Sequence, residues 1–213
     1  MKSIRRTVQT MPQSEFDREV GETFAYLTEL YRRTAELFME VTGQLEKAGW
    51  ARFPAGTGIN IHGSTSEQIT ERWFVRHPSL FFMRRGDDQF TRVLCFGVSF
   101  VGSSKTFKPS AHGILFEFTR PKERLTRLYS WYEDSACEPV ELDFVEEGEE
   151  EGFRYKRAKP EDESSNWPDL DQLVLIEVPL SRVDTVDDVR HLVGLLIALG
   201  LNGLEGARGT LSS

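Results

Sequence analysis

A glycine- and serine-rich stretch at residues 97–106 is the first place where the residue types suggest chemistry. It reads Gly-Val-Ser-Phe-Val-Gly-Ser-Ser-Lys-Thr, the composition of a phosphate-binding loop. In such a loop the lysine directly follows the second glycine, so that its amine reaches the phosphates. Here two serines separate Gly102 from Lys105, and a strand is predicted next instead of the helix that would hold the phosphate. Val101 also stands where a nucleophile elbow needs its second glycine. The stretch therefore predicts a polar loop between strands.

The histidines and the strand carboxylates would suit a metal-dependent hydrolase or nuclease. The histidines are His62, His77, His112 and His191. They are separated by 15, 35 and 79 positions, so no two share a helical face as paired metal ligands do. A site assembled in space could use Asp87, Asp88, Glu117 or His112. No motif fixes such a site, so this class stays an alternative, and neither a metal nor a cofactor is predicted.

Charge is distributed unevenly along the chain. The sequence has 26 Lys and Arg against 34 Asp and Glu, a net charge of −8. Residues 72–127 carry eleven basic and four acidic side chains, a net +7, whereas residues 133–171 carry four basic and fifteen acidic ones, a net −11. The average argues against a general nucleic-acid binder, but it hides a basic segment. The anion-binding candidates in that segment are Arg84, Arg85, Arg92, Lys105 and Lys108.

Two arrangements of these segments stay open. If the basic and acidic segments lie side by side, they neutralise each other. If they lie apart, the basic strands, with their interleaved aromatic residues, could bind an anion or a single-stranded nucleic acid. An acidic loop, predicted at 146–172, would then act as a gate, because surface ion pairs contribute only about 0–1 kcal/mol each. Its glutamates are also candidates for binding a protein partner, namely Glu146, Glu147, Glu149, Glu150 and Glu151.

A long amphipathic helix is predicted over residues 14–49. Apolar residues recur there at alternating steps of four and three, a heptad rhythm whose one gap is filled by Thr34. Ser14 suits the N-cap, and Gly49 suits the left-handed residue that ends a helix. Such a helix lies across a sheet or pairs with a partner helix. The candidates for contacts with a partner are Phe24, Leu27, Tyr31, Phe38 and Val41.

Short β-rich runs separated by turn residues follow between residues 59 and 180. The candidate strands are 59–62, 73–75, 80–84, 90–101, 112–119, 125–132, 141–145, 152–157 and 173–178. Gly86 and the two aspartates after it predict a hairpin between the third and fourth of these runs. Local connections favour an antiparallel meander of about seven to nine strands.

A short second helix is predicted at 185–200. Thr185 and Asp188 form its capping box, and Gly200 ends it. The helix is apolar after His191, which predicts that it is buried on the sheet. Residues 201–213 are predicted to form a flexible tail. Together these elements predict one α+β domain that spans residues 1–213.

The composition predicts a cytoplasmic protein. The N-terminal residues lack the apolar run of a secretory signal. The most apolar stretch, residues 192–201, is about half as long as a membrane-spanning helix. Cys95 and Cys137 form no disulfide framework, and Cys95 is expected to be a buried thiol.

The leading functional hypothesis is a non-enzymatic protein-interaction or regulatory module that binds a protein partner or a second copy of itself. It rests on the long patterned helix and the separate charged segments, and on the lack of a reaction motif. An anion or single-stranded nucleic-acid binder is the first alternative, and the metal-dependent hydrolase is the second. No membrane partner is expected.

Overall fold

The computed structural model describes residues 13–53, 78–87, 91–100, 109–118, 144–150, 152–158 and 170–211. Two units are distinguished, Met1–Met39 and Glu40–Ser213, and each is described by itself. Several predicted features lie outside the described residues: the strands at 59–62, 73–75 and 125–132, and the candidates Lys105, Lys108 and Glu151. The prediction of a single domain stays a prediction.

Helix α1 (Gln13–Lys47) confirms the predicted long helix. Its final residues, from Glu40, belong to the second unit. The chain leaves the helix at Gly49, whose φ of 89° lies in the left-handed region that favours glycine. The Gly49 amide donates a hydrogen bond to the Glu46 carbonyl at 3.2 Å. The glycine therefore ends the helix where the sequence predicts.

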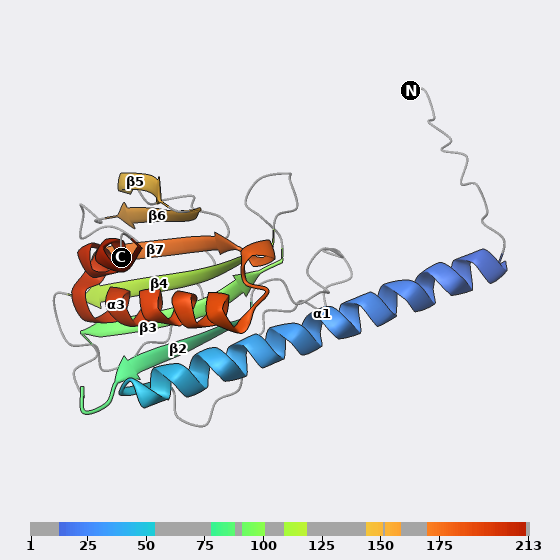
Figure 1. Cartoon of the computed structure of the whole chain (residues 1–213), viewed down its shortest axis with the longest axis horizontal. Helices are drawn as coiled ribbons and strands as arrows, with labels where there is room; N and C mark the ends of the chain where they lie inside the picture. Colours follow the sequence, from blue (N-terminus) through green and yellow to red (C-terminus); the bar gives the residue numbers. More distant parts are fainter. Residues whose placement is uncertain are drawn as a thin grey trace, which may run out of the picture. The chain divides into compact units, whose positions relative to one another are not determined.

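Seven strands form one antiparallel sheet among the described residues of the second unit, which confirms the predicted α+β fold (Figure 1). They are β1 (Trp50–Phe53), β2 (Ser79–Arg84), β3 (Arg92–Ser99), β4 (Ser110–Phe118), β5 (Phe144–Glu150), β6 (Phe153–Ala158) and β7 (Leu170–Pro179). Their order across the sheet is β1-β2-β3-β4-β7-β6-β5. Two meanders, β1 to β4 and β5 to β7, are thus joined where β4 pairs with β7.

Glycines at positive φ make the tight turns. Gly86, with φ of 84°, follows β2, and β2 pairs antiparallel with β3 as predicted. Gly152, with φ of 82°, lies between the paired strands β5 and β6. Strand β1 was not predicted, because its four residues directly follow a long helix and show no alternation of their own.

The acidic loop predicted at 146–172 is wrong for residues 146–150, which belong to β5, whereas β6 confirms the strand predicted at 152–157. The physical reason is the pairing of opposite charges across these two strands. Glu146 lies opposite Arg157, and Glu147 lies opposite Lys156. Such cross-strand pairs stabilise a strand that its own composition disfavours.

Helix α3 (Val186–Leu211) begins with the predicted capping box. The Asp188 amide donates to Thr185 Oγ1 at 3.2 Å, and the Thr185 amide donates to Asp188 Oδ2 at 2.8 Å. The pKa of Asp188 lies below its usual value. The largest cause is the hydrogen bond that the Thr185 side chain donates to the Asp188 carboxylate, and the bond from the Thr185 amide is the second. The reciprocal bonds satisfy amides that the first turn of a helix leaves without partners.

The predicted end of this helix at Gly200 is wrong, as is the flexible tail over residues 201–211. The helix continues to Leu211, with a kink at Gly203, where φ is 66°. Gly200 has another role, because a Cβ there would overlap the indole ring of Trp50. The glycine is required for this close approach rather than for a turn.

Both faces of the central strands are buried. Gly113 of β4 lies against Leu196 of α3, so alternation places Leu115 on the α3 face and Ile114 on the opposite face. The opposite face holds an apolar cluster of Phe81, Val93, Cys95, Ile114, Phe116, Phe118, Leu170, Leu173 and Leu175. The expected burial of the Cys95 thiol is confirmed.

The α3 face explains why the last helix is so apolar. By length and composition alone, residues Val186–Thr210 could span a membrane. Four leucines of this helix, however, are at most 1% exposed: Leu192, Leu195, Leu196 and Leu199. In Figure 1 the helix crosses one face of the sheet over β3 and β4. Packing on the sheet therefore accounts for its composition.

Two glycines of α3 should respond in opposite ways to the same substitution. Gly200→Ala is expected to lower the free energy of unfolding by about 1–3 kcal/mol, because the new methyl group meets a rigid, buried indole ring. Gly194→Ala is the matched control: no atom lies within 4 Å of its Cβ position, so alanine should raise stability by about 0.5–1 kcal/mol through helix propensity. Urea unfolding measures both. Equal stability of the two variants would contradict the packing of Gly200 on Trp50.

Candidate functional site

A row of polar side chains lies on the sheet face that points away from α3. Ser110 and His112 are two residues apart on β4, so they share this face with Ile114. The strand register places His112 beside Glu177 of β7, and Glu177 beside Arg154 of β6. The row therefore crosses three neighbouring strands.

Ser110 and His112 form the buried end of this row. Ser110 Oγ and His112 Nε2 lie 2.5 Å apart and share a hydrogen bond. His112 is only 2% exposed. Burial lowers the pKa of His112 to about 4, although the nearby Glu177 carboxylate acts in the opposite direction. The imidazole is therefore neutral at pH 7.

A neutral imidazole beside a serine hydroxyl has the components of a general base and a nucleophile. Such chemistry requires that a substrate reaches both groups, and both are buried. The pair therefore acts in this structure as a buried polar contact within the sheet. His112 is a candidate from the sequence, whereas Ser110 is not. The available signal was the two-residue spacing, which was lost because the predicted strand began at His112.

The structure does not bring together the residues of the hydrolase alternative. Glu117 and His112 are five positions apart on β4, so their side chains point to opposite faces. Asp87 lies after the β2 turn, and Asp88 lies outside the described residues. Within the described ranges, no three His, Cys, Asp or Glu side chains are placed to hold a metal ion.

Three of the anion-binding candidates lie around the β2–β3 turn. Arg84 ends β2, Arg85 follows in the turn, and both are exposed. Arg92, at the start of β3, has its Nη2 atom 2.5 Å from Glu117 Oε1 and donates from Nη1 to the Leu201 carbonyl at 2.8 Å. Arg92 therefore connects β3 to β4 and to α3. From the sequence it was expected to bind an anion, and this structural role was not predicted.

Four of the five acidic candidates lie on β5, at an edge of the sheet: Glu146, Glu147, Glu149 and Glu150. Glu146 Oε2 lies 2.6 Å from Arg157 Nη2, and its Oε1 lies 3.1 Å from Arg208 Nη1 of α3. Glu147 Oε2 lies 3.6 Å from Lys156 Nζ. Glu146 and Glu147 of β5 are thus paired with cations of β6 and α3.

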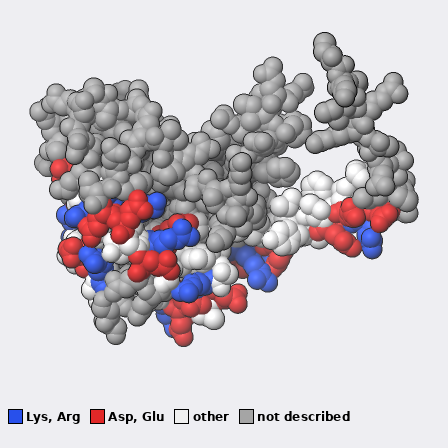
Figure 2. All heavy atoms as spheres, turned by 90° about the horizontal axis from the view of Figure 1, so that it is seen from above, with Lys and Arg blue, Asp and Glu red and all other residues white. Residues whose placement is uncertain are grey.

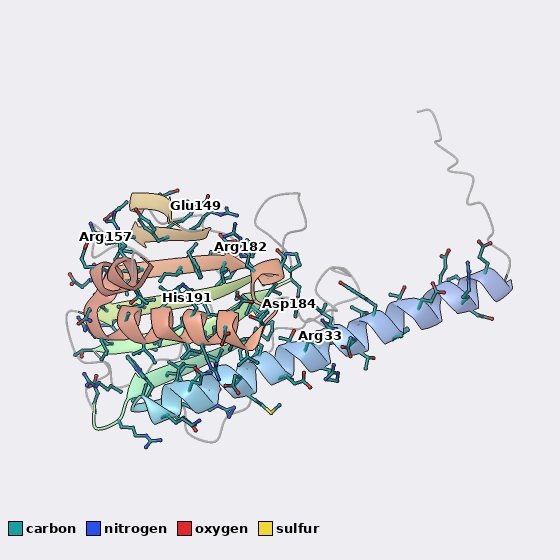
Figure 3. The ribbon with its side chains drawn as sticks, in the orientation of Figure 1. Arg33, Glu149, Arg157, Arg182, Asp184 and His191 are labelled. Carbon is teal, nitrogen blue, oxygen red and sulfur yellow. The ribbon has the colours of Figure 1, made fainter. Side chains whose placement is uncertain are left out.

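Among the described residues, Arg92 pairs with Glu117 inside the basic segment, and Glu146 and Glu147 pair with β6 and α3. Strands β4, β7 and β6 separate the basic β2–β3 turn from acidic β5. In the view of Figure 2, side chains of both signs lie next to one another over the described surface. Glu149 of β5 is exposed (Figure 3). The side chain of Glu150 is outside the described part of the chain, as is the whole of Glu151.

The apolar stripe of α1 changes from exposed to buried along the helix. Phe24 is 65% exposed, and Leu27 and Tyr31 are half-buried. Phe38 is buried, and Val41 belongs to the core of the second unit. Of the partner-binding candidates on this helix, Phe24, Leu27 and Tyr31 therefore remain accessible.

A cavity of about 370 Å³ lies among β6, the short helix η2 (Leu180–Arg182) and α3. Its lining residues are Phe153, Arg182, Val183, Asp188, His191 and Leu192. Arg182 packs against Gly152, where any Cβ would overlap its guanidinium. The Phe153 and His191 rings lie 5.4 Å apart. Figure 3 labels Arg182 and His191, the two basic groups at this cavity. Of the lining residues, His191 is a candidate from the sequence, and Arg182 is not.

Comparison of the chain with protein families, with curated proteins and with solved structures found no match.

The buried His112 should make stability depend on pH. Its pKa is about 4 in the folded protein, against 6.5 as its ordinary value. Between these values the unfolded chain binds a proton that the folded protein does not bind, so the free energy of unfolding falls as the pH falls from 6.5 to 4. The expected loss from this one group is about 3 kcal/mol.

Urea unfolding of the wild type and of His112→Gln at several pH values measures this effect. Carboxylates that do not interact with His112 contribute equally to both proteins, so the difference between the two curves reports on His112 and its interaction with Glu177. The variant should lose less stability on acidification. Parallel curves between pH 6.5 and 4 would show that His112 is not a buried neutral imidazole.

Proposed function

We propose that this protein is a non-enzymatic, cytoplasmic interaction module that binds another protein through one face of α1. That face, here called the seam, comprises Val20, Phe24, Leu27 and Tyr31. The observation that carries the proposal is the exposure of Phe24, a large aromatic residue at the centre of a patterned apolar stripe. An exposed apolar stripe on a helix is typical of a surface that a partner helix covers.

Charged side chains on the opposite face of the helix pair with one another. Arg32 Nη2 lies 2.8 Å from Glu29 Oε1, and Arg32 also pairs with Glu36. Arg33 Nε lies 2.8 Å from the same Glu29 oxygen. The hydrogen bond from Arg32, and to a smaller extent the one from Arg33, lowers the pKa of Glu29 to about 2. The charged face is therefore satisfied within the helix and suits contact with water.

The second candidate, binding of a polyanion to the basic strands, has weaker support. It needs several cations on one surface, and Arg92 is already bound to Glu117 and to a backbone carbonyl. Arg84 and Arg85 are left as its exposed residues among the described candidates. Two adjacent arginines give little of the salt-dependent affinity that a nucleic-acid binder requires.

The proposal predicts that benzoylphenylalanine, a photo-crosslinking amino acid, forms a protein adduct in cells when it replaces Phe24 and forms little when it replaces Tyr26. Phe24 lies on the seam, and Tyr26, two residues away, lies on the outer face. Their exposures are 65% and 66%, which makes Tyr26 a matched control. Irradiation of cells that express the full chain should give a protein adduct from position 24 and little from position 26, as measured by gel shift and mass spectrometry.

Two outcomes count against the proposal. Adducts of equal yield at positions 24 and 26 would show that exposure alone, rather than the seam, determines the contacts. The lack of any protein adduct at position 24 would remove the interaction surface altogether.

A further inference from the structure

We infer that the partner on the seam is a second copy of this chain, so that two α1 helices pair with each other. This inference rests on the proposed function and names the occupant of its surface. Three properties of the helix support it: its flanking positions, its threonine hydroxyls and the limits of the exposed stripe.

The positions that flank the seam carry no charge. When two helices pair, the residues on either side of the apolar seam determine the choice of partner, usually through complementary Glu and Lys or Arg. In α1 these positions are Gly21, Thr23, Thr28, Leu30, Ala35 and Leu37. An uncharged flank does not repel an identical helix, and it contains no charge pattern that would select a different chain.

All charged residues between positions 18 and 36 lie on the outer face instead. They are Arg18, Glu19, Glu22, Glu29, Arg32, Arg33 and Glu36. The heptad spacing keeps each of them away from both the seam and its flanks. Two copies can therefore pair without burying an ionised group, which would be costly.

The threonines at the seam and its flanks have satisfied hydroxyl groups. The Thr23 hydroxyl donates to the Glu19 carbonyl, and that of Thr28 donates to the Phe24 carbonyl, both at 2.8 Å. Each therefore already has a partner within its own helix. Burial against a second helix would leave these two hydroxyl groups hydrogen-bonded.

The part of the seam that is exposed or half-buried is short. Asp17 precedes it at a seam position, and Thr34 and Phe38 follow it as buried residues. The twelve residues from Val20 to Tyr31 correspond to about 18 Å of helix. Such a contact is small, so a reversible dimer that depends on protein concentration is expected rather than a permanent one.

Light scattering after size-exclusion chromatography of the full chain tests the inference over about 1–200 µM, the range in which a small interface should dissociate. The wild type is expected to shift from monomer to dimer as the concentration rises. Phe24→Glu places a carboxylate in the seam of both copies and should raise the dissociation constant about 100-fold or more. Tyr26→Glu, on the outer face, should change it less than about threefold.

Circular dichroism and urea unfolding of each variant show whether the fold is kept, and Leu27→Glu provides a second seam variant. A wild type that stays monomeric throughout this range would overturn the inference. So would equal effects of Phe24→Glu and Tyr26→Glu in folded proteins.

The crosslinking experiment separates the two proposals. An adduct at position 24 with the mass of two chains supports both. An adduct of another mass, together with a monomeric wild type, retains the proposed function and rejects self-pairing. If neither an adduct nor a dimer is found, both the proposed function and the self-pairing are rejected.

Discussion

The pairing of β4 with β7 is the interaction on which the second unit depends. The two strands are far apart in the sequence, and their register runs from Ser110 opposite Pro179 to Phe118 opposite Leu170. This ladder joins two meanders that would otherwise be separate sheets of three and four strands. It also brings Glu177 to His112, and it extends the apolar surface that α3 covers. Because the contact is non-local, its entropy of loop closure is large, and burial on both faces must offset it.

Local signals in the sequence predicted the elements that local physics controls. The capping box of Thr185 and Asp188, the positive φ of Gly49 and the turn at Gly86 each depend on a few neighbouring residues, and all three are found. The order of the strands depends on pairing between distant segments, so the position of β7 between β4 and β6 could not be derived. The acidic strand β5 was missed for the same reason, because the cations that stabilise it, Arg157 and Arg208, lie on other elements.

The candidate site, like the fold, was predicted only in the parts that depend on neighbouring residues. The heptad rhythm predicted the stripe on α1, but it could not predict which half is buried, since the pattern that suits a protein core also suits a partner helix. Counting charges predicted a basic segment, yet Arg92 turned out to connect β3, β4 and α3. Its partner Glu117 sits opposite it in the β3–β4 register, which only the paired strands reveal. The Ser110–His112 pair required the correct first residue of β4.

One continuous helix therefore carries the same four-three spacing through two environments. Val41 and Leu45 are fully buried in the second unit, whereas Phe24 is mostly exposed. If the exposed half were simply a solvated helix, charged residues at its seam would make it more soluble at no structural cost. Instead the seam and its flanks from Val20 to Phe38 contain none, and the charges gather on the other face, where they pair with one another. This division of the helix surface is what burial against another apolar surface requires, and solvation alone gives no reason for it.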